Sequence, residues 1–251
     1  MQGTVENVID GRAQWCVVQG DALAVLASLP QGSVDAVVCD PPYGMAYQSA
    51  WSKDGPRFAE IVGDDTPSVG FVRDAVRSLK PGGGLFLFCE WRHQEAFRGA
   101  MADAGATIRS QCVWDREHHG MGDLVSAFAP CHDIGWFATK GDGFKFHGSR
   151  PQTVLRFPRV AAAGMVHPAQ KPTSLMRYLV SRLCPIGGVV LDPFAGSGST
   201  LVAAVTEGRR CIGVEITEGY AKLAADRVAA ACAGTDYRNP QQGGLFASGG
   251  I

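Results

Sequence analysis

The sequence predicts a doubly wound α/β fold with a mostly parallel sheet. Seven short runs rich in branched, aromatic and other apolar residues are bounded by turn residues, as buried strands are. Segments with helical periodicity separate most of these runs, which is typical of parallel strands joined by crossover helices. The chain has 251 residues, 46% of them hydrophobic, which is enough for one domain with a complete core.

The expected strands and helices alternate along the chain. The strands cover residues 15–19, 35–39, 84–89, 108–114, 132–139, 187–192 and 210–215. The helices cover residues 21–29, 66–79, 91–105, 171–183, 199–208 and 217–234. Asp21 is expected to cap the first helix. No helical pattern separates 108–114 from 132–139, so these two strands are expected to form an antiparallel hairpin at one edge of the sheet.

The remaining segments are expected to be loops and a tail around a single domain. We predict one domain over residues 1–235, followed by a flexible, glycine-rich tail over 236–251. Long loops are expected at about 44–66, 115–131 and 140–166. The N-terminus lacks the pattern of a signal peptide, and no apolar run approaches the roughly 18 residues of a membrane span. We therefore expect a cytoplasmic protein.

Charge and cysteine content exclude some classes of protein. A net charge of -1 argues against a protein that coats nucleic acid over its whole surface. Residues 140–182, however, contain eight Lys and Arg residues and one acid, which fits either a solvated basic face or a footprint for a phosphate backbone. The eight cysteines show no C-x-x-C pair, so buried free thiols are expected. A zinc site would have to use Cys112, His118, His119, Cys131 and His132, whose spacing matches no common pattern, and no metal is expected.

Polar residues and glycines follow several of the expected strands. In an open α/β sheet, ligands bind at these carboxyl ends of the strands. Strand 187–192 runs into PFAGSGST, where Gly196 and Gly198 would let a ligand approach the backbone at a helix N-terminus. The next strand ends in Glu215, where Rossmann-type sites bind ribose hydroxyls. Taken singly, the glycine turn could serve packing alone, and Glu215 could be a surface acid.

Four motifs together resemble the S-adenosylmethionine-dependent DNA amino-methyltransferases. They are DPPYG, HPAQKPTSLM, LDPFAGSGST and CIGVEITEGYAKLAADR, and the resemblance spans roughly residues 15–232. Their order is that of the circularly permuted, beta-type members, in which the catalytic motif precedes the cofactor motif. The resemblance implies a Rossmann-like methyltransferase fold with a seven-stranded sheet in the order 3-2-1-4-5-7-6, the seventh strand being antiparallel. It also implies a bacterial or phage-encoded enzyme.

The resemblance implies where S-adenosylmethionine binds. Asp21 would receive the 6-amino group of the cofactor's adenine, besides its role as a helix cap, and Lys171 would help to hold the methionine end. The implied cofactor-binding residues are Asp21, Ala22, Asp40, Lys171, Asp192, Pro193, Phe194, Ala195, Gly196, Ser197, Gly198, Glu215 and Ile216.

The resemblance also explains why a buried strand ends in Asp40, Pro41, Pro42 and Tyr43. An exocyclic base amine is a poor nucleophile, because its lone pair is delocalised into the ring. The family uses the aspartate carboxylate and the backbone carbonyl of the first proline to accept both amine hydrogens, which aims the lone pair at the methyl group. The prolines would hold these acceptors rigidly, and Tyr43 would stack on a base flipped out of the duplex. Without the other motifs, the same residues could be a proline-rich turn.

Several substrates stay open at this point. Asp40 as the first residue of its motif favours the 6-amino group of adenine over the 4-amino group of cytosine. An RNA or protein-glutamine methyltransferase is another alternative, although glutamine-modifying relatives usually carry Asn at that position. A catalytically silent DNA-binding subunit would normally have lost part of DPPY or FAGSG, and both are intact. A dinucleotide oxidoreductase fits worst, because the full G-x-G-x-x-G pattern is missing.

Double-stranded DNA is the expected partner, and a homodimer is left open. The candidate DNA contacts are Arg57, Arg116, His118, His119, Lys145, Arg150 and Arg156, each of which could equally be a solvated surface residue. In the tail, Gln242, Leu245 and Phe246 resemble the short peptide with which bacterial DNA-acting proteins bind the replication sliding clamp. Gly243 stands where the fuller clamp pattern has an apolar residue, so a simple apolar tip is the alternative.

Overall fold

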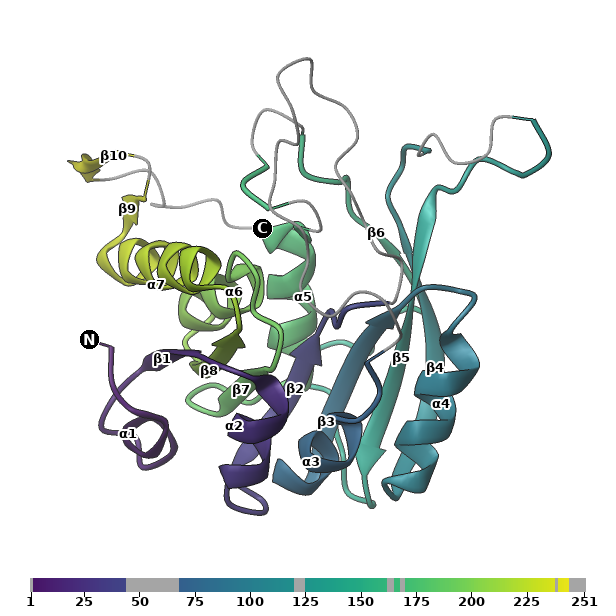
Figure 1. The fold of residues 1–251 in the computed structure, drawn as a ribbon, viewed down its shortest axis with the longest axis horizontal. Coiled ribbons are helices and arrows are strands. Elements are labelled where there is room, and N and C mark those ends of the chain that lie inside the picture. The colour runs from purple at the N-terminus through teal and green to yellow at the C-terminus, as the bar shows by residue number, and fades with distance from the viewer. Residues whose placement is uncertain are drawn as a thin grey trace.

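The chain folds around a central eight-stranded sheet with helices on both faces (Figure 1). The computed structural model describes residues 2–43, 68–119, 125–161, 165–167, 170–237 and 239–243. The strands are β1 (Trp15–Gln19), β2 (Val34–Cys39), β3 (Leu79–Cys89), β4 (Ala106–Asp115), β5 (His132–Lys140), β6 (Val154–Arg156), β7 (Val189–Asp192) and β8 (Arg210–Glu215), with β9 (Thr235–Asp236) and β10 (Asn239–Gly243) in a separate pair. The helices are α1 (Val5–Ile9), α2 (Ala22–Ser28), α3 (Val72–Ser78), α4 (Gln94–Asp103), α5 (Thr173–Leu183), α6 (Ser199–Thr206) and α7 (Glu218–Ala233).

The strand order of the large sheet is β1-β8-β7-β2-β3-β5-β4-β6. All pairings are parallel except those of β5, which runs antiparallel to both β3 and β4. The seven strands expected from the sequence are therefore all present, they occur in the expected order, and one of them is antiparallel. The N-terminal strand β1 lies at one end of the sheet, beside a strand that comes almost 200 positions later in the chain (Figure 1).

The predicted strand count of seven is wrong, because β6 adds an eighth strand. β6 pairs in parallel with β4, so the β4–β5 hairpin does not form the edge of the sheet. Within the predicted loop 140–166, Leu155 is buried and the indole N–H of Trp114 donates a hydrogen bond to the Phe157 carbonyl at 2.7 Å. A strand of three residues carries too little periodicity to be recognised in the sequence.

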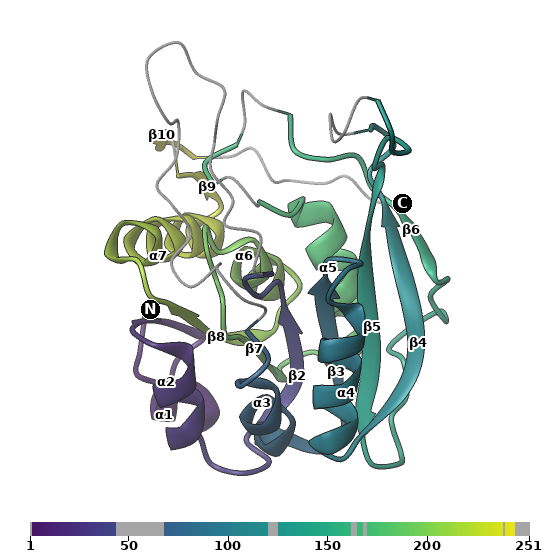
Figure 2. The same ribbon diagram turned by 45° about the vertical axis from the view of Figure 1, so that its right-hand side comes forward.

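The helices cover the sheet in two layers. Helices α5, α6 and α7 pack on one face, and α2, α3 and α4 pack on the other, with a separate cluster of buried apolar side chains under each layer (Figures 1 and 2). The predicted cap of α2 is confirmed, because Asp21 Oδ1 accepts a hydrogen bond from the Leu23 N–H at 3.0 Å. The short helix α1 was not expected from the sequence; it begins at Val5, and the side chain of the preceding Thr4 caps it.

One predicted loop and part of the predicted tail lie outside the described residues. The predicted loop 44–66 lies outside the described residues, as do Leu245 and Phe246, whereas Gln242 lies in β10. The predicted tail therefore contains part of the antiparallel β9–β10 pair. All eight cysteines are free thiols, and the expected burial is found for all except Cys131 and Cys232. Among the described residues, no three His, Cys, Asp or Glu side chains group as metal ligands would, and no helix is long and apolar enough to cross a membrane.

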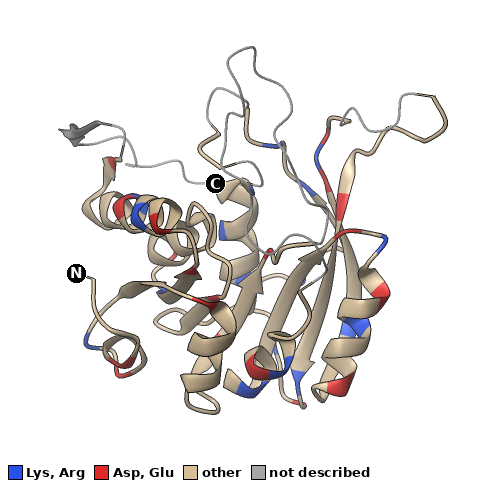
Figure 3. Cartoon of the chain, viewed as in Figure 1, with Lys and Arg blue, Asp and Glu red and all other residues tan. Residues whose placement is uncertain are grey.

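Charge is distributed unevenly over these elements. Helices α4 and α7 carry acidic and basic residues together, whereas the end of β6 and the segment after it carry only basic charges among their described residues (Figure 3). These charges are Arg156, the last residue of β6, and Arg159, which reaches the carboxyl edge of the parallel strands. The basic stretch of the sequence is therefore placed partly beside the edge where ligands bind.

Gly135 in β5 tests the packing between neighbouring strands. A Cβ atom at this position would lie 2.5 Å from Cζ of the buried Phe86 ring, so Gly135→Ala is expected to destabilise the protein by about 1–3 kcal/mol through overpacking. Gly99→Ala in α4 is the matched control, because a Cβ there meets nothing within 4 Å. It is expected to stabilise the helix by about 0.5–1 kcal/mol. Urea unfolding measures both, and equal stability of the two variants would contradict this account of the core.

Candidate active site

A cavity of about 650 Å³ opens at the carboxyl edge of the parallel strands. It is lined by the residues that follow β1, β2, β7 and β8, together with residues from β4, β5 and the segment before α5. The predicted catalytic and cofactor-binding residues that line it are Asp21, Ala22, Asp40, Pro41, Pro42, Tyr43, Lys171, Asp192, Pro193, Phe194, Ala195, Gly196, Ser197, Glu215 and Ile216. Residues that are more than 170 positions apart in the chain thus share one cavity.

Gly198 is the one member of the predicted set that does not line the cavity, and it shapes the turn instead. It is the N-cap of α6 with a φ of 82°, a left-handed conformation that favours glycine. A Cβ there would lie 3.0 Å from the Ala224 Cβ on α7, so glycine also permits the close packing of the turn on that helix. The Arg227 guanidinium donates to the Ser197 carbonyl from the same side. The glycine turn is therefore rigidly supported.

The acids around this turn accept hydrogen bonds from the backbone. Glu215 Oε2 accepts from the Gly196 N–H and Oε1 from the Thr217 N–H, both at 2.9 Å. Asp192 is 3% exposed, and its Oδ1 accepts from the Phe194 N–H at 3.1 Å. Burial raises the pKa of Asp192 to about 7, although hydrogen bonds to its carboxylate oppose the rise.

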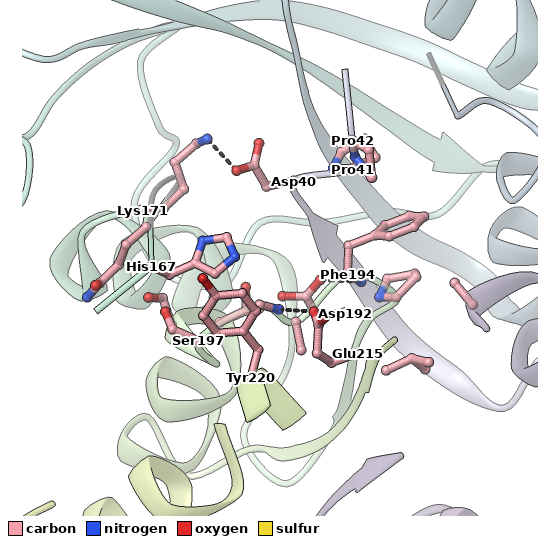
Figure 4. A pocket seen from close by; sticks show the side chains of 18 of the residues that line it. Asp40, Pro41, Pro42, His167, Lys171, Asp192, Phe194, Ser197, Glu215 and Tyr220 are labelled. Carbon is pink, nitrogen blue, oxygen red and sulfur yellow. Dashed lines mark hydrogen bonds and ion pairs between the residues drawn. The ribbon is translucent and has the colours of Figure 1, made fainter. Parts of the chain in front are cut away.

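Asp40 lies at the opposite side of the cavity and is held by two side chains (Figure 4). Its Oδ2 accepts from Lys171 Nζ at 2.5 Å, and its Oδ1 accepts from the Tyr43 hydroxyl. Burial raises the pKa of the Asp40 carboxyl, and the Lys171 ammonium opposes that rise. Burial, followed by the Asp40 charge, raises the pKa of Tyr43 well above its usual value, so this phenol stays neutral.

Lys171 contacts the DPPY turn in this structure. The sequence suggested that it holds the methionine end of a cofactor at the glycine turn, and its side chain does line the shared cavity. Its ammonium, however, reaches Asp40 and lies 3.8 Å from Asp133 Oδ2. One buried lysine therefore links the DPPY turn to Asp133 at the start of β5.

Several residues of the cavity were not predicted. They include Trp114, Asp133, Arg159, His167, Gln170, Thr200 and Tyr220. His167 and Gln170 belong to the HPAQKP motif, which was the available signal for them. Burial lowers the pKa of His167 to about 4, so its ring is neutral where it meets Tyr220, with 4.4 Å between ring centroids (Figure 4). Asp133 carries no motif signal, since it lies at the start of an antiparallel strand.

The candidate DNA contacts are dispersed. Arg116 lines the cavity and lies 3.4 Å from Asp133 Oδ1, and Arg156 lies 3.7 Å from Asp115. His118 and His119 are exposed beyond the end of β4, and Arg57 lies outside the described residues. Lys145 and Arg150 line a separate cavity of about 550 Å³, between the segment after β5 and α5. Of the described candidates, the structure thus brings only Arg116 into contact with the main cavity.

Comparison with protein families identifies the chain. The sequence model of the N6/N4 DNA methylases matches residues 34–226. The chain belongs to this family of DNA methylases. The match covers the strands, turns and helices that build the cavity, apart from β1, the turn with Asp21, and α2.

Individual members of the family resemble this methylase over most of its length. The DNA adenine methyltransferase YhdJ of Escherichia coli (strain K12) is 27% identical over 249 residues, covering 84% of this chain and 82% of YhdJ. Two crystal structures share its fold. The complex of M1.HpyAVI with SAM has a TM-score of 0.66 at 21% identity, covering 85% of this chain and 99% of that one. The PvuII DNA methyltransferase, cytosine-N4-specific, has a TM-score of 0.69 at 18% identity, covering 91% and 93%.

The raised pKa of Asp192 makes stability depend on pH. Its folded pKa of about 7 lies above the ordinary value of 3.8, so the folded state binds more protons than the unfolded state between these values. The contribution of Asp192 is therefore full at low pH and lost as the pH rises through about 7. An asparagine side chain cannot ionise, so Asp192→Asn should gain stability relative to the wild type as the pH rises, by about 1 kcal/mol or more.

Urea unfolding of the methylase between about pH 5 and pH 8.5 measures this gain. Asp103→Asn, an exposed substitution on α4, is the matched comparison. A stability difference for Asp192→Asn that does not change with pH, or that changes equally in both variants, would contradict the assignment of a buried, weakly acidic Asp192.

Proposed function

We propose that this methylase transfers a methyl group from S-adenosylmethionine to the exocyclic amine of a base flipped out of double-stranded DNA. The proposal adds the methyl donor and the target group to the family assignment, and it rests mainly on one observation. Asp40 and the glycine turn at Gly196 lie on opposite sides of a single cavity, as an amine acceptor and a cofactor site must. The permuted order of the motifs, with DPPY before FAGSG, supports a beta-type member of the family.

The cavity has the donors and acceptors that S-adenosylmethionine needs. Glu215 ends β8 and Asp21 follows the neighbouring parallel strand β1, whose Gln19 is paired with Glu215, so both carboxylates line the cavity and are available to ribose hydroxyls and the adenine amino group. Ile216 and Phe194 supply apolar lining for the adenine ring. The volume of about 650 Å³ is also within the range of cofactor sites.

The chemistry at the base depends on the DPPY turn. When bound, S-adenosylmethionine supplies an electrophilic methyl group for in-line displacement. Asp40 and the Pro41 carbonyl accept the two hydrogens of the base amine, which restores its lone pair for attack. Tyr43 stacks on the base and offsets part of the cost of flipping it. The proton released after methyl transfer passes to Asp40, whose raised pKa makes it a better base than an exposed aspartate.

Adenine is the favoured target base, and cytosine is the alternative. Asp40 at the first position of the motif favours the adenine 6-amino group. The likeness to YhdJ, named as a DNA adenine methyltransferase, supports the same choice. Transfer of tritiated methyl groups to PCR-amplified plasmid DNA, followed by nucleoside analysis, distinguishes N6-methyladenine from N4-methylcytosine.

Asp40→Ala is expected to abolish methyl transfer while calorimetric binding of S-adenosylmethionine stays within a few-fold of the wild type. The reason is that Asp40 contacts the base amine and not the ribose or adenine of the cofactor. Asp74→Ala, which removes a carboxylate paired with Arg77 on α3, is the matched control and should transfer methyl groups normally. Turnover by Asp40→Ala near the wild-type rate would exclude Asp40 from catalysis.

Glu215→Ala is expected to weaken binding of S-adenosylmethionine by about 1–3 kcal/mol, the cost of a lost hydrogen bond to a charged group. Because Glu215 also accepts from the Gly196 N–H, Glu215→Gln should retain part of the turn and lose less affinity. Glu95→Ala on the exposed part of α4 serves as control. Cofactor affinity that is the same in all three variants would show that Glu215 does not touch the ribose.

A further inference from the structure

The environment of Lys171 differs from that of an ordinary lysine. The residue is 7% exposed, and its Nζ lies 2.5 Å from Asp40 Oδ2 and 3.8 Å from Asp133 Oδ2. Three aromatic rings surround the ammonium, with centroid distances of 5.6 Å to Tyr43, 5.0 Å to Phe88 and 5.8 Å to Trp114. A buried ammonium is tolerated only where such partners compensate for lost water.

Both carboxylate oxygens of Asp40 accept a hydrogen bond from a side chain. Lys171 donates to Oδ2 and the Tyr43 hydroxyl donates to Oδ1. A base amine that uses Asp40 as its acceptor must therefore share an oxygen with one of these donors or displace it. Tyr43 can leave if it reorients to stack on the base, but Lys171 would still hold the second oxygen and place a positive charge beside the reacting nitrogen.

Asp133 offers Lys171 a second carboxylate. A shift of the ammonium by about 1 Å would bring it within hydrogen-bond distance of Asp133 Oδ2 without leaving the aromatic cage. Arg116, 3.4 Å from Oδ1 of the same carboxylate, holds Asp133 in place. Asp133 reaches the cavity because β5 is antiparallel, so that its first residues lie at the edge where the parallel strands end.

We propose that Lys171 is a placeholder for the target amine: it neutralises Asp40 in the base-free enzyme and moves to Asp133 when the flipped base arrives. The inference rests on the proposed function, since it takes Asp40 as the acceptor of the base amine. Lys171 and Asp133 are then positioning residues. They prepare Asp40 to receive a neutral donor without leaving a buried, unpaired carboxylate between turnovers.

Among the described residues, the ionisable groups that face Asp40 are Cys39 from β2, Tyr43 from its own turn, Lys171 before α5, Asp133 from β5, Cys89 from β3 and Asp192 from β7. Burial raises the pKa of Tyr43 and Cys89, which keeps both neutral. Asp192 is unchanged in the variants compared below, so differences between those variants report on Lys171 and Asp133. Lys171 lowers the pKa of Asp40 and Asp133 raises it.

These opposite effects predict opposite pH profiles. The two variants compared are Lys171→Met and Asp133→Asn. Their kcat/KM for DNA is measured against pH, with PCR-amplified plasmid DNA as the substrate. Lys171→Met should move the acidic limb to higher pH, because Asp40 ionises less readily without the ammonium, so that activity increases towards alkaline pH. Asp133→Asn should move the acidic limb to lower pH and reduce the plateau by about tenfold or more, because Lys171 then stays on Asp40.

The double variant makes the test specific. If Asp133 acts by receiving Lys171, Asp133→Asn should have no further effect on the plateau in the Lys171→Met background. Asp74→Asn, which alters an ion pair with Arg77 outside the cavity, should match the wild type at every pH. A wild-type plateau for Asp133→Asn overturns the proposal. So does a Lys171→Met protein that is inactive at every pH although it folds and binds S-adenosylmethionine.

One measurement separates this inference from the proposed function. In DNA-free protein labelled with ¹⁵N-lysine, the buried Lys171 ammonium should give a slowly exchanging signal that is absent in Lys171→Met and lost in Asp40→Asn. Absence of the signal in the wild type overturns the placeholder role whether or not methyl transfer occurs. A wild type that shows the signal but methylates no DNA refutes the proposed function and leaves the ion pair standing.

Discussion

Four carboxylates gather at one edge of the sheet because β1, β8, β7 and β2 are parallel and end on the same side. They are Asp21, Glu215, Asp192 and Asp40. Like charges in one cavity repel each other, and burial adds the cost of lost hydration. Most other features of the site can be understood as compensation for this concentration of negative charge.

The compensation differs with the depth of each acid. Asp21 is exposed and caps α2, and Glu215 accepts two backbone N–H groups. The most buried acid, Asp192, combines backbone hydrogen bonding with a pKa raised to about 7. Asp40 is paired with the Lys171 ammonium instead, so in our proposal it is the acid whose partner changes when a neutral base amine arrives.

The other half of the sheet supplies that cation's environment. Because β5 runs against its neighbours, its first residues meet the ends of β3 and β4, which places Asp133 near Trp114 and Lys171. β6 then covers β4, and the chain continues from it to Arg159 at the cavity. The antiparallel strand and its added neighbour thus build the side of the cavity that faces the proposed target base.

Local sequence was sufficient to predict the seven main strands and the residues of the glycine turn and the DPPY turn, whereas the order of the strands in the sheet came from the family resemblance. These features depend on periodicity and on motifs in which neighbouring residues act together. The packed fold was needed to show that Lys171 meets Asp40, that Asp133 joins them, and that β6 closes the sheet. Asp133 and Lys171 are 38 positions apart and lie on elements whose contact depends on strand direction and packing, which no local pattern records.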